Sequence, residues 1–460
     1  MQLTFTPNTT TWLLCAALLS IIWLPNLLTK GMFMDGVINA LVAENLANGL
    51  GSFYHLKDYN YPENDYNGHP PLAFLLQAFF FKLTGSAHYM ERIYSLLCLL
   101  VQVGLLTSIW KNINIKNYAY CDALPVVFFV LCPVAIFSYS NNLLENTMSI
   151  FTTASVWWVC LSITGRSRRQ FCALMSGFML TAALLCKGPV ALFVLAAPLL
   201  FWRERTTGVY YTALMLITAL LVGLILYLID KDFGWMLERY YREQLSRVFH
   251  LAGEKWWIRF RIWAYLLINL LPMLLVWGIF YWQGNRGMGP KDVAFRFIAL
   301  GLAGSVPLAI GHKQSAFYLL PAMPFMAMGF SLLSADGIEK FMQRLSATQQ
   351  HVIVFLSAVL IMVALSLCVL NKDRVKRDHD LINDAAEIAR NVNGKYANAG
   401  WDLDEEWHFR AYLYRYHKVA VCMPANSCNT LYYIHKRAVS PVNGMKRIYS
   451  GNRFDLYKSN

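Results

Sequence analysis

The chain has 460 residues, of which 57% are hydrophobic and only 15% charged, and its mean hydropathy is +0.39. Soluble proteins carry about 25% charged residues, so this composition excludes an ordinary soluble enzyme. Apolar runs of roughly 17–25 residues, each long enough to cross a bilayer as a helix, recur from Trp12 to Leu370. The strands of an outer-membrane barrel would instead alternate polar and apolar residues. The sequence therefore predicts an α-helical polytopic membrane protein.

The formal net charge of +13 would suggest a nucleic-acid partner in a soluble protein, but it has another explanation in a membrane protein. We attribute it to anionic lipid head groups and to the excess of Lys and Arg in cytoplasmic loops, and we expect no nucleic-acid partner. Many of the Cys residues lie within apolar runs, where a free thiol behaves as a small hydrophobe. Because no CxxC or Cys/His zinc spacing occurs, we expect neither a bound metal nor another cofactor.

Eleven full spans are expected, together with one shorter apolar helix at 72–84. The full spans are 12–28, 93–110, 124–139, 146–163, 171–185, 189–202, 210–229, 264–282, 295–310, 315–334 and 351–370. The first span has no basic segment before it and no small-residue cleavage site after it, so we interpret it as a retained helix. At about 1.5 Å per residue the shorter helix reaches about 20 Å, less than the ~30 Å bilayer core. We expect it to lie along the outer face or dip into it.

Basic residues set the orientation of the spans, because Lys and Arg gather in alternate connections. These residues are Lys111, Lys116, Arg166, Arg168, Arg169, Arg203, Arg205, Arg286, Lys291, Lys340 and Arg344. By the positive-inside rule their connections are cytoplasmic. The outward connections are then 31–71, 140–145, 186–188, 230–263, 311–314 and everything after 370.

The last part of the chain has the composition of a soluble domain. Its pattern predicts a helix at Asp380–Arg390 and strands at Lys418–Cys422, Leu431–His435 and Arg447–Leu456. We therefore divide the chain into a transmembrane domain, 1–370, and a small extracytoplasmic α/β domain, 371–460. Cys422 and Cys428 flank a turn-like segment, and an oxidising exterior would allow a disulfide between them.

The outward connection 31–71 is the longest polar interval in the first third of the chain. Asp35 stands at the start of an amphipathic segment that we expect to lie on the membrane surface. One interpretation makes Asp35 a helix N-cap, and the other makes it a general base or cation anchor at the lipid boundary. His69, in GHPPL, is either an ordinary satisfied polar group or a hydrogen-bond donor to a phosphate or a substrate hydroxyl.

Further ionisable residues stand at the outward ends of predicted spans. Glu145 begins a span, where the helix dipole favours an anion. Lys187, in CKGPVALF, is either a snorkelling lysine or a phosphate contact. Lys313 lies in a very short outward turn shortly before Tyr318. Ionisable groups next to the membrane core are costly and therefore tend to be functional.

The outward connection 230–263 carries several cations against the charge bias, interleaved with Trp and Tyr. It is compatible with an interfacial amphipathic helix anchored by aromatic residues. It is equally compatible with cations, among them Arg242 and Arg247, that are kept outside to bind a phosphate.

The motifs point away from nucleotide chemistry, because no Walker motif, GxGxxG or GxSxG occurs. Sugar transfer at the outer face would use a lipid-linked sugar whose phosphate is the leaving group. Such a reaction needs a base for the acceptor hydroxyl and cations for the departing phosphate. Asp35 suits the first role, and Arg242, Arg247, Lys187 and Lys313 suit the second.

Taken in order, these motifs resemble those of the polytopic lipid-phosphate-sugar-dependent glycosyltransferases of the GT-C fold. That family includes the protein O-mannosyltransferases and the bacterial aminoarabinose transferases. The resemblance covers most of residues 1–330. Its motifs are Asp35 after the first span, HPPL at His69–Leu72, Leu144-Glu145, KGP at Lys187–Pro189, Arg247–His250 before Trp256-Trp257, and Lys313 with a following YLLPAMP that contains Tyr318.

The chain departs from the family pattern at three positions. Gly36 stands where many members have Glu, and Glu145 stands where Asp is usual. Gly68 stands where the aminoarabinose branch has an acidic residue that looks like a metal ligand, so the resemblance carries no metal over to this chain.

The resemblance implies an inverting glycosyltransferase at the outer face of the cytoplasmic membrane, the bacterial inner membrane. Its donor would be a polyprenyl-phosphate-linked sugar, and its acceptor a carbohydrate, lipid or protein, among surrounding membrane lipids. Asp35 would activate the acceptor, with Glu145 in support. The residues expected to bind substrate are His69, Lys187, Arg242, Arg247, His250, Lys313 and Tyr318.

Two other functions stay open. A transporter or flippase of lipid-linked sugars would need charged residues deep within the spans, and few are found there. A purely structural subunit would leave the dense polar content of residues 31–71 unexplained.

Overall fold

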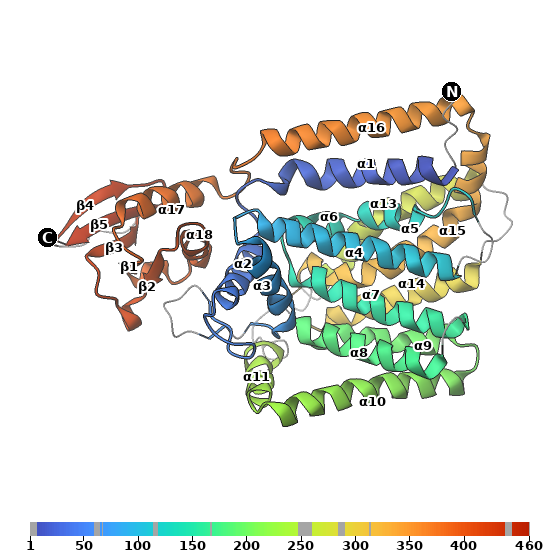
Figure 1. Ribbon diagram of the computed structural model, residues 1–460, viewed down its shortest axis with the longest axis horizontal. Coiled ribbons are helices and arrows are strands. Elements are labelled where there is room, and N and C mark those ends of the chain that lie inside the picture. Colours follow the sequence, from blue (N-terminus) through green and yellow to red (C-terminus); the bar gives the residue numbers. More distant parts are fainter. Residues whose placement is uncertain are drawn as a thin grey trace.

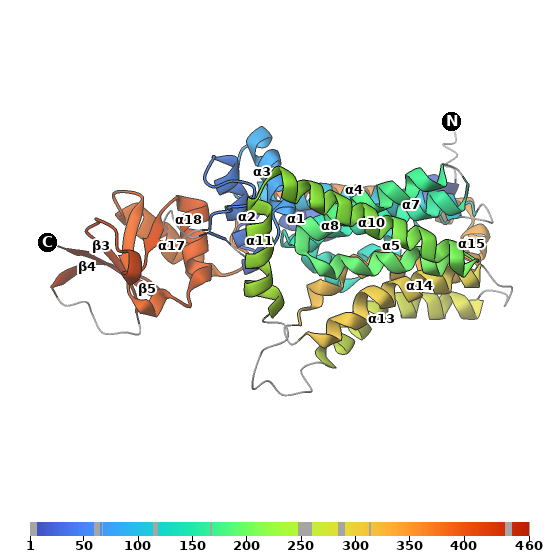
Figure 2. The ribbon, with the colours of Figure 1, turned by 90° about the horizontal axis from the view of Figure 1, so that it is seen from below.

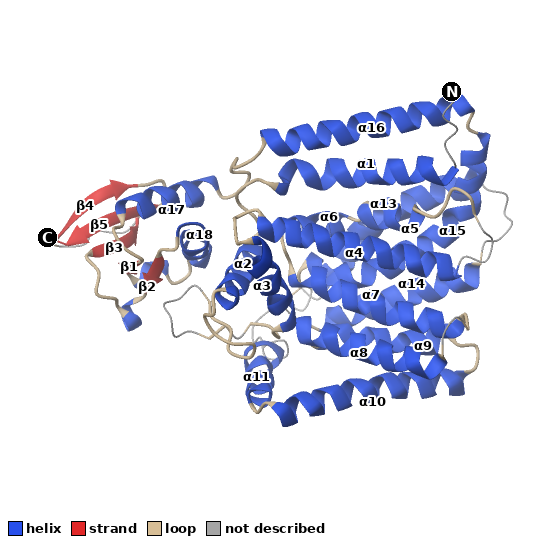
Figure 3. Ribbon diagram, in the orientation of Figure 1, coloured by secondary structure: helices blue, strands red, loops and turns tan. Residues whose placement is uncertain are grey.

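In the computed structural model the chain forms a bundle of long helices with a small α/β domain at one end (Figure 1). The structure describes residues 7–58, 65–66, 68–113, 118–165, 168–246, 260–283, 290–311, 314–437 and 444–459. The α/β domain stays at the same end after a quarter turn (Figure 2), and the strands are confined to it (Figure 3). The predicted fold class is thereby confirmed.

Nine helices form the length of the bundle in the described part of the chain. They are α1 (Pro7–Leu27), α4 (Met90–Ile113), α7 (Leu144–Ile163), α8 (Arg169–Lys187), α10 (Arg205–Ile229), α13 (Arg261–Gln283), α14 (Lys291–Ser305), α15 (Met323–Arg344) and α16 (Ala347–Leu370). Shorter pieces extend or complete the rows, namely α5 (Leu124–Val130), α6 (Pro133–Ser140), η1 (Pro189–Leu195), α9 (Ala196–Phe201), η4 (Val306–Ile310) and η5 (Ala316–Ala322). Eight helical segments among the described residues are long and apolar enough to cross a membrane.

Two of the predicted spans show details that the apolar pattern did not predict. The expected span 124–139 is divided at Cys132 into α5 and α6, because Pro133 has no N–H with which to continue the helix. The expected span 146–163 forms α7, but its polar side chains bond to α4. The Asn146 amide donates to Ser95 Oγ at 2.6 Å, and Gln102 donates to Thr153 Oγ1 at 2.9 Å. Such bonds hold neighbouring helices together where water is scarce.

Three short helices, α2 (Met34–Ala47), α3 (Leu72–Thr84) and α11 (Asp232–Tyr240), lie at the end of the bundle nearest the α/β domain (Figure 1). The bounds of α3 are those predicted. The prediction that α2 lies on the membrane surface is wrong, because its residues from Gly36 to Asn45 are all buried. The helix is covered by α3 and by α18 (Trp407–His417) of the C-terminal domain.

The C-terminal domain is one five-stranded sheet with helices packed beside it. Its strands are β1 (Tyr396–Ala399), β2 (Ala420–Cys422), β3 (Tyr432–Lys436), β4 (Met445–Ser450) and β5 (Phe454–Ser459), in the order β2-β1-β3-β5-β4. The β1 strand pairs in parallel with β2 and β3, whereas β5 pairs antiparallel with β3 and β4. The predicted helix is present as α17 (His379–Asn391).

Sequence patterns missed three features of this domain. The single strand expected at Arg447–Leu456 is a hairpin of β4 and β5, which turns at Gly451. Strand β1 and helix α18 were not predicted.

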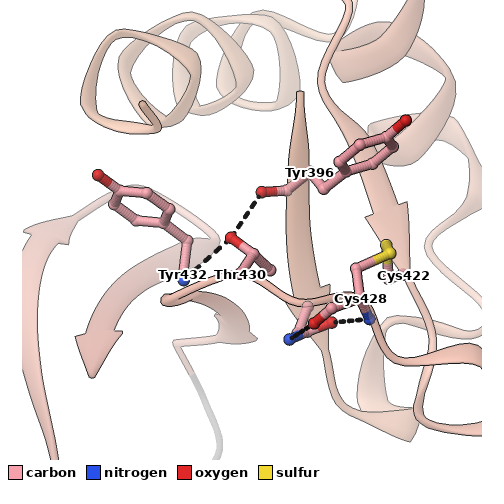
Figure 4. The surroundings of a disulfide bond; sticks show 6 residues. Tyr396, Cys422, Cys428, Thr430 and Tyr432 are labelled. Carbon is pink, nitrogen blue, oxygen red and sulfur yellow. Dashed lines mark hydrogen bonds between the residues drawn. A yellow bond between two sulfur atoms is a disulfide. The ribbon is translucent and has the colours of Figure 1, made fainter. Parts of the chain in front are cut away.

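A disulfide joins Cys422 to Cys428 (Figure 4), and the Asn398 side chain bonds to both the amide and the carbonyl of Cys428.

A buried charge cluster fixes α18 to the membrane-domain helices. The Arg415 guanidinium lies 3.3 Å from Glu44 of α2 and 2.8 Å from Glu91 of α4. It also donates to the carbonyls of Ser86 and Ala87. Removing one member of such a cluster leaves a buried charge without its partner, which is strongly unfavourable.

Tyrosine hydroxyls extend this contact to the segment that leads into α2. The Tyr412 hydroxyl accepts from the Met32 amide at 3.1 Å and lies 2.8 Å from the Met32 carbonyl oxygen. The Tyr416 hydroxyl accepts from the Gly31 amide at 3.2 Å. The C-terminal domain therefore holds the backbone immediately before Asp35.

Candidate functional site

Asp35 is placed by the first turn of α2. The N-cap residue of α2 is Phe33, which shows that Asp35 is not the N-cap. Asp35 lies in the first turn, where the helix dipole favours a negative charge, and its side chain is half-buried. The next residue explains the departure from the family pattern, because a Cβ at Gly36 would lie 1.8 Å from the Asn141 carbonyl oxygen. Only glycine allows α2 to approach the α6–α7 connection this closely.

A cavity of about 270 Å³ opens beside Asp35 at this end of the bundle. It is lined by residues from α2, α7, α8, η5 and α18, and by Asp58, Tyr66, Gly68, His69, Leu143 and Gln244. Five predicted site residues line it, namely Asp35, His69, Glu145, Lys187 and Tyr318. Segments far apart in the sequence thus bring carboxylates and a cation to one polar cavity, and such convergence is typical of a binding or active site.

Glu145 and Lys187 form a buried ion pair at the wall of this cavity. Glu145 is in the first turn of α7 and Lys187 is the last residue of α8. The Lys187 ammonium also lies over two rings, 4.8 Å from the centroid of Tyr318 and 5.3 Å from that of Phe317. A cation held over aromatic faces and against a carboxylate is fixed in position. Lys187 is therefore not a snorkelling side chain.

Gly188 and Tyr240 fix the backbone at Lys187. Gly188 ends α8 with a φ of +80°, and a Cβ there would lie 2.3 Å from the Tyr240 hydroxyl oxygen. That hydroxyl donates to the Lys187 carbonyl at 3.1 Å. Burial raises the pKa of Tyr240 to about 12, so it stays a neutral donor at physiological pH. The 230–246 connection thus fixes the backbone that carries Lys187 in the cavity wall.

Two solved structures match almost the whole chain. Both are ArnT from Cupriavidus metallidurans, one bound to undecaprenyl phosphate (TM-score 0.71) and one in the apo state (TM-score 0.68). Each is 12% identical, and the match covers 97% of this chain and 97% of the other. This chain has the GT-C fold. Residues 68–229 also match the family model of the dolichyl-phosphate-mannose-protein mannosyltransferases. No curated protein sequence matches the chain.

Of the remaining predicted residues, the structure describes only Arg242, and it is not brought to the cavity. The Arg242 side chain is exposed and pairs with Glu238 one turn away on the same helix. It does not line the cavity, although Gln244 does. Arg247, His250 and Lys313 lie outside the described residues.

The cavity of the GT-C fold also contains residues that the sequence did not single out. Asn39 follows Asp35 by one helical turn, a spacing that would have indicated a shared face. Asp58 and Tyr66 belong to the 31–71 connection, whose polar content was noticed as a whole. Trp407 comes from α18 of the C-terminal domain, and no local pattern in the sequence connects it with Asp35.

Among the residues that the structure describes, no group of three or more His, Cys, Asp or Glu is arranged to hold a metal ion. At position 68 the backbone packs against Tyr66, whose hydroxyl oxygen would lie 2.7 Å from a Cβ. A larger residue there would displace Tyr66 from the cavity wall.

Proposed function

We propose that the protein is an inverting glycosyltransferase that moves a sugar from a polyprenyl-phosphate donor to a hydroxyl-bearing acceptor. The observation that carries this proposal is the convergence of Asp35, His69, Glu145 and Lys187 on one cavity at the end of a GT-C bundle. Two likenesses support it. The ArnT structure holds undecaprenyl phosphate, and the matched family is described by a dolichyl-phosphate-mannose donor.

In the proposed reaction Asp35 takes the proton of an acceptor hydroxyl. The hydroxyl oxygen then forms a bond to the anomeric carbon of the donor from the face opposite the phosphate. The bond between that carbon and the phosphate oxygen breaks, and its electron pair leaves with the polyprenyl phosphate. One displacement inverts the configuration, and the proton remains on Asp35 until it is released to water.

The departing phosphate needs positive charge, which Lys187 would supply, and His69 would add a hydrogen-bond donor. An ammonium carries three N–H donors, and the bond to Glu145 uses one of them. The rings of Tyr318 and Phe317 hold the ammonium in place before substrate arrives. A preorganised cation stabilises developing negative charge without a cost of reorganisation at the moment of reaction.

Glu145 has a different proposed role from the one the sequence suggested. It is 1% exposed and bound to Lys187, so it is poorly placed to meet an acceptor hydroxyl. We assign it the task of orienting Lys187. Asp35, which is half-buried and lines the same cavity, is the better base.

The C-terminal domain would form the acceptor side of the site through Trp407. A tryptophan ring offers a large apolar face, and its N–H can bond to a polar ligand. Docking of α18 on the segment before Asp35 places this ring and the proposed base in one cavity. The domain would thus complete the site and not only cover it.

The outer face of the cytoplasmic membrane is the proposed location of the cavity. The cavity is lined by residues of α2 and by Trp407 of α18 in the C-terminal domain, and α2 lies at the end of the bundle nearest that domain (Figure 1). The disulfide between Cys422 and Cys428 in that domain favours an oxidising compartment.

The distribution of buried charge favours an enzyme over a transporter. Among the described residues of α4, α7 and α8, the buried charged side chains lie at helix ends. Glu91 and Arg92 begin α4, Glu145 begins α7, and Lys187 ends α8. A transport path would place such groups near the middle of the spans.

The test is transfer of label from a panel of radiolabelled polyprenyl-phosphate sugars to membrane extracts. Wild type is compared with Asp35→Asn and with Asp380→Asn, which removes an exposed carboxylate on α17. We expect transfer with wild type and Asp380→Asn, and a loss of at least about a thousandfold with Asp35→Asn. Full transfer by a well-folded Asp35→Asn would remove Asp35 from the role of base. No transfer from any donor by wild type that still binds polyprenyl phosphate would favour the transporter.

A further inference from the structure

A second cavity, of about 370 Å³, lies between the membrane helices and the C-terminal domain, beside the buried Arg415 cluster. Its membrane-domain wall is formed by Lys30, Glu44 and the Ser86–His88 segment. Its other wall is formed by α17 and by residues 415–418 at the end of α18. The proposed transfer reaction does not use it.

Hydrogen-bond donors without partners converge on this cavity. Arg415 stands in its wall, where its Nη atoms are used by two carboxylates and two carbonyls. Among the described residues, no hydrogen bond or ion pair engages the side chain of Lys30 or that of His417. Unused donors inside a polar cavity are unfavourable unless a ligand or water satisfies them.

The charges around the cavity sum to a positive value. Arg415, Lys418 and Lys30 face Glu44, with Glu91 behind it. Burial, and to a smaller extent this surplus, lowers the pKa of the two histidines in the wall. Burial and the Lys30 charge lower the pKa of His88 to about 4, against the attraction of Asp373. Burial, Lys30 and Arg390 likewise lower the pKa of His417.

The cavity is connected to a basic segment at the point where the chain leaves the bundle. Lys372, Arg374 and Lys376 follow the end of α16 and are exposed. The amide of Lys30 donates to the Arg374 carbonyl at 2.9 Å, and the amide of Lys376 donates to the Lys30 carbonyl at 3.0 Å. Cations at the end of a membrane bundle attract anionic head groups.

From these observations we infer that this cavity is an anion site for a phosphate group, with Lys30 and His417 as its donors and the Arg415 charge beside them. A phosphate offers several strong acceptor oxygens and matches a set of N–H donors better than a carboxylate does. The group can belong to a lipid head group at the bilayer surface or to a free phosphate-bearing compound, since both present the same chemistry. The inference does not depend on the proposed transfer reaction.

The experiment uses the full chain in a neutral detergent and measures its thermal unfolding midpoint against ligand concentration, since a ligand that binds the native state raises the midpoint. The probes are inorganic phosphate, glucose 1-phosphate, and short-chain phosphatidylglycerol, at constant ionic strength set with chloride. Short-chain diacylglycerol serves as the lipid without phosphate. The variant Lys30→Gln/His417→Gln removes two donors, and Lys395→Gln/Lys446→Gln removes two exposed cations of the C-terminal domain that do not line the cavity.

We expect saturable stabilisation of wild type and of Lys395→Gln/Lys446→Gln by at least one phosphate-bearing probe, and at least a tenfold weaker apparent affinity in Lys30→Gln/His417→Gln. Stabilisation by phosphatidylglycerol alone identifies a head group as the source, and stabilisation by glucose 1-phosphate or phosphate identifies a free compound. Equal affinity in both double variants, or no stabilisation of wild type by any probe up to about 10 mM, would overturn the inference. Loss of phosphate binding with intact sugar transfer separates this site from the cavity at Asp35.

Discussion

Glu145 and Lys187 meet at the facing ends of α7 and α8 and form a buried ion pair in the wall of the cavity. Both side chains are almost fully buried, so each charge depends on the other. Replacing one member of a buried pair costs about 3–5 kcal/mol, whereas replacing both by neutral groups of similar volume is often tolerated. The pair therefore has a structural role that is separable from any role in transfer.

We predict that Lys187→Met alone destabilises the protein by about 3–5 kcal/mol and that Lys187→Met/Glu145→Gln recovers much of this loss. Thermal unfolding in detergent of the two single variants and the double variant measures the coupling. The double variant should fold and still lack transfer, because the cation for the leaving phosphate is gone. Additive losses of stability would contradict the pairing, and transfer by the double variant would contradict the proposed role of Lys187.

The contact between Gly36 and Asn141 gives a second prediction. Gly36→Ala forces a methyl group against a backbone oxygen, and overpacking of this kind costs about 1–3 kcal/mol. Because α2 must shift, Asp35 moves with it and transfer should fall by at least about tenfold. Gly104→Ala is the matched control, since among the described residues no heavy atom other than those of its chain neighbours and its own helix backbone lies within 4 Å of its Cβ position. That variant should be neutral or slightly more stable, because alanine favours the helix.

Apolar run length and turn residues predicted most of the membrane bundle, because both act locally along the chain. The helix at 72–84 has the bounds expected, and the predicted spans lie on observed helices. Burial of α2 could not be predicted, because it depends on α18, which lies more than three hundred residues away in the sequence. A helix that looks amphipathic by itself becomes a core element when a distant domain covers its polar face.

The candidate site, too, could be predicted only in part from local sequence. Asp35, His69, Glu145, Lys187 and Tyr318 stand in recognisable local motifs, and the structure brings all of them to one cavity. The pairing of Glu145 with Lys187 depends on how α7 packs against α8, which no local pattern encodes. The position of Trp407 in the cavity depends on docking of the C-terminal domain, and no sequence pattern indicates it. Arg242 stood in a suggestive basic stretch, yet its side chain faces outward and pairs with Glu238.

Trp407 leads to the third prediction. Trp407→Ala should raise the KM for the acceptor roughly tenfold or more while changing that for the donor little, since a large aromatic contact is worth about 1–2 kcal/mol. Trp401→Ala is the control, because that ring is 64% exposed in the same domain and does not line the cavity. The measurement is initial transfer rates with each substrate varied in turn. Equal effects of the two variants, or a change confined to the donor, would place the acceptor elsewhere.

His88 makes the docking of the C-terminal domain sensitive to acid. Burial, Lys30 and Arg415 lower the pKa of its imidazole, and Asp373 and a bond to the Leu28 backbone partly oppose them, so the folded pKa is about 4 against an ordinary value of 6.5. The unfolded chain therefore binds more protons than the folded chain between these two values. Stability contributed by neutral His88 is present above pH 6.5 and is lost progressively as the pH falls toward 4, by on the order of 2–3 kcal/mol.

His88→Gln should remove this dependence, because glutamine keeps a polar side chain of similar reach that does not titrate in that range. Unfolding midpoints are measured from pH 7.5 to pH 4. They should fall less steeply with decreasing pH in His88→Gln than in wild type. His351→Gln, a change at the start of α16 far from the docking surface, controls for loss of a histidine as such. Parallel curves for wild type and His88→Gln would show that acid acts on other groups. A steeper fall in His88→Gln would mean that the folded protein raises the pKa of His88, and would require that Asp373 stabilise the protonated imidazole there.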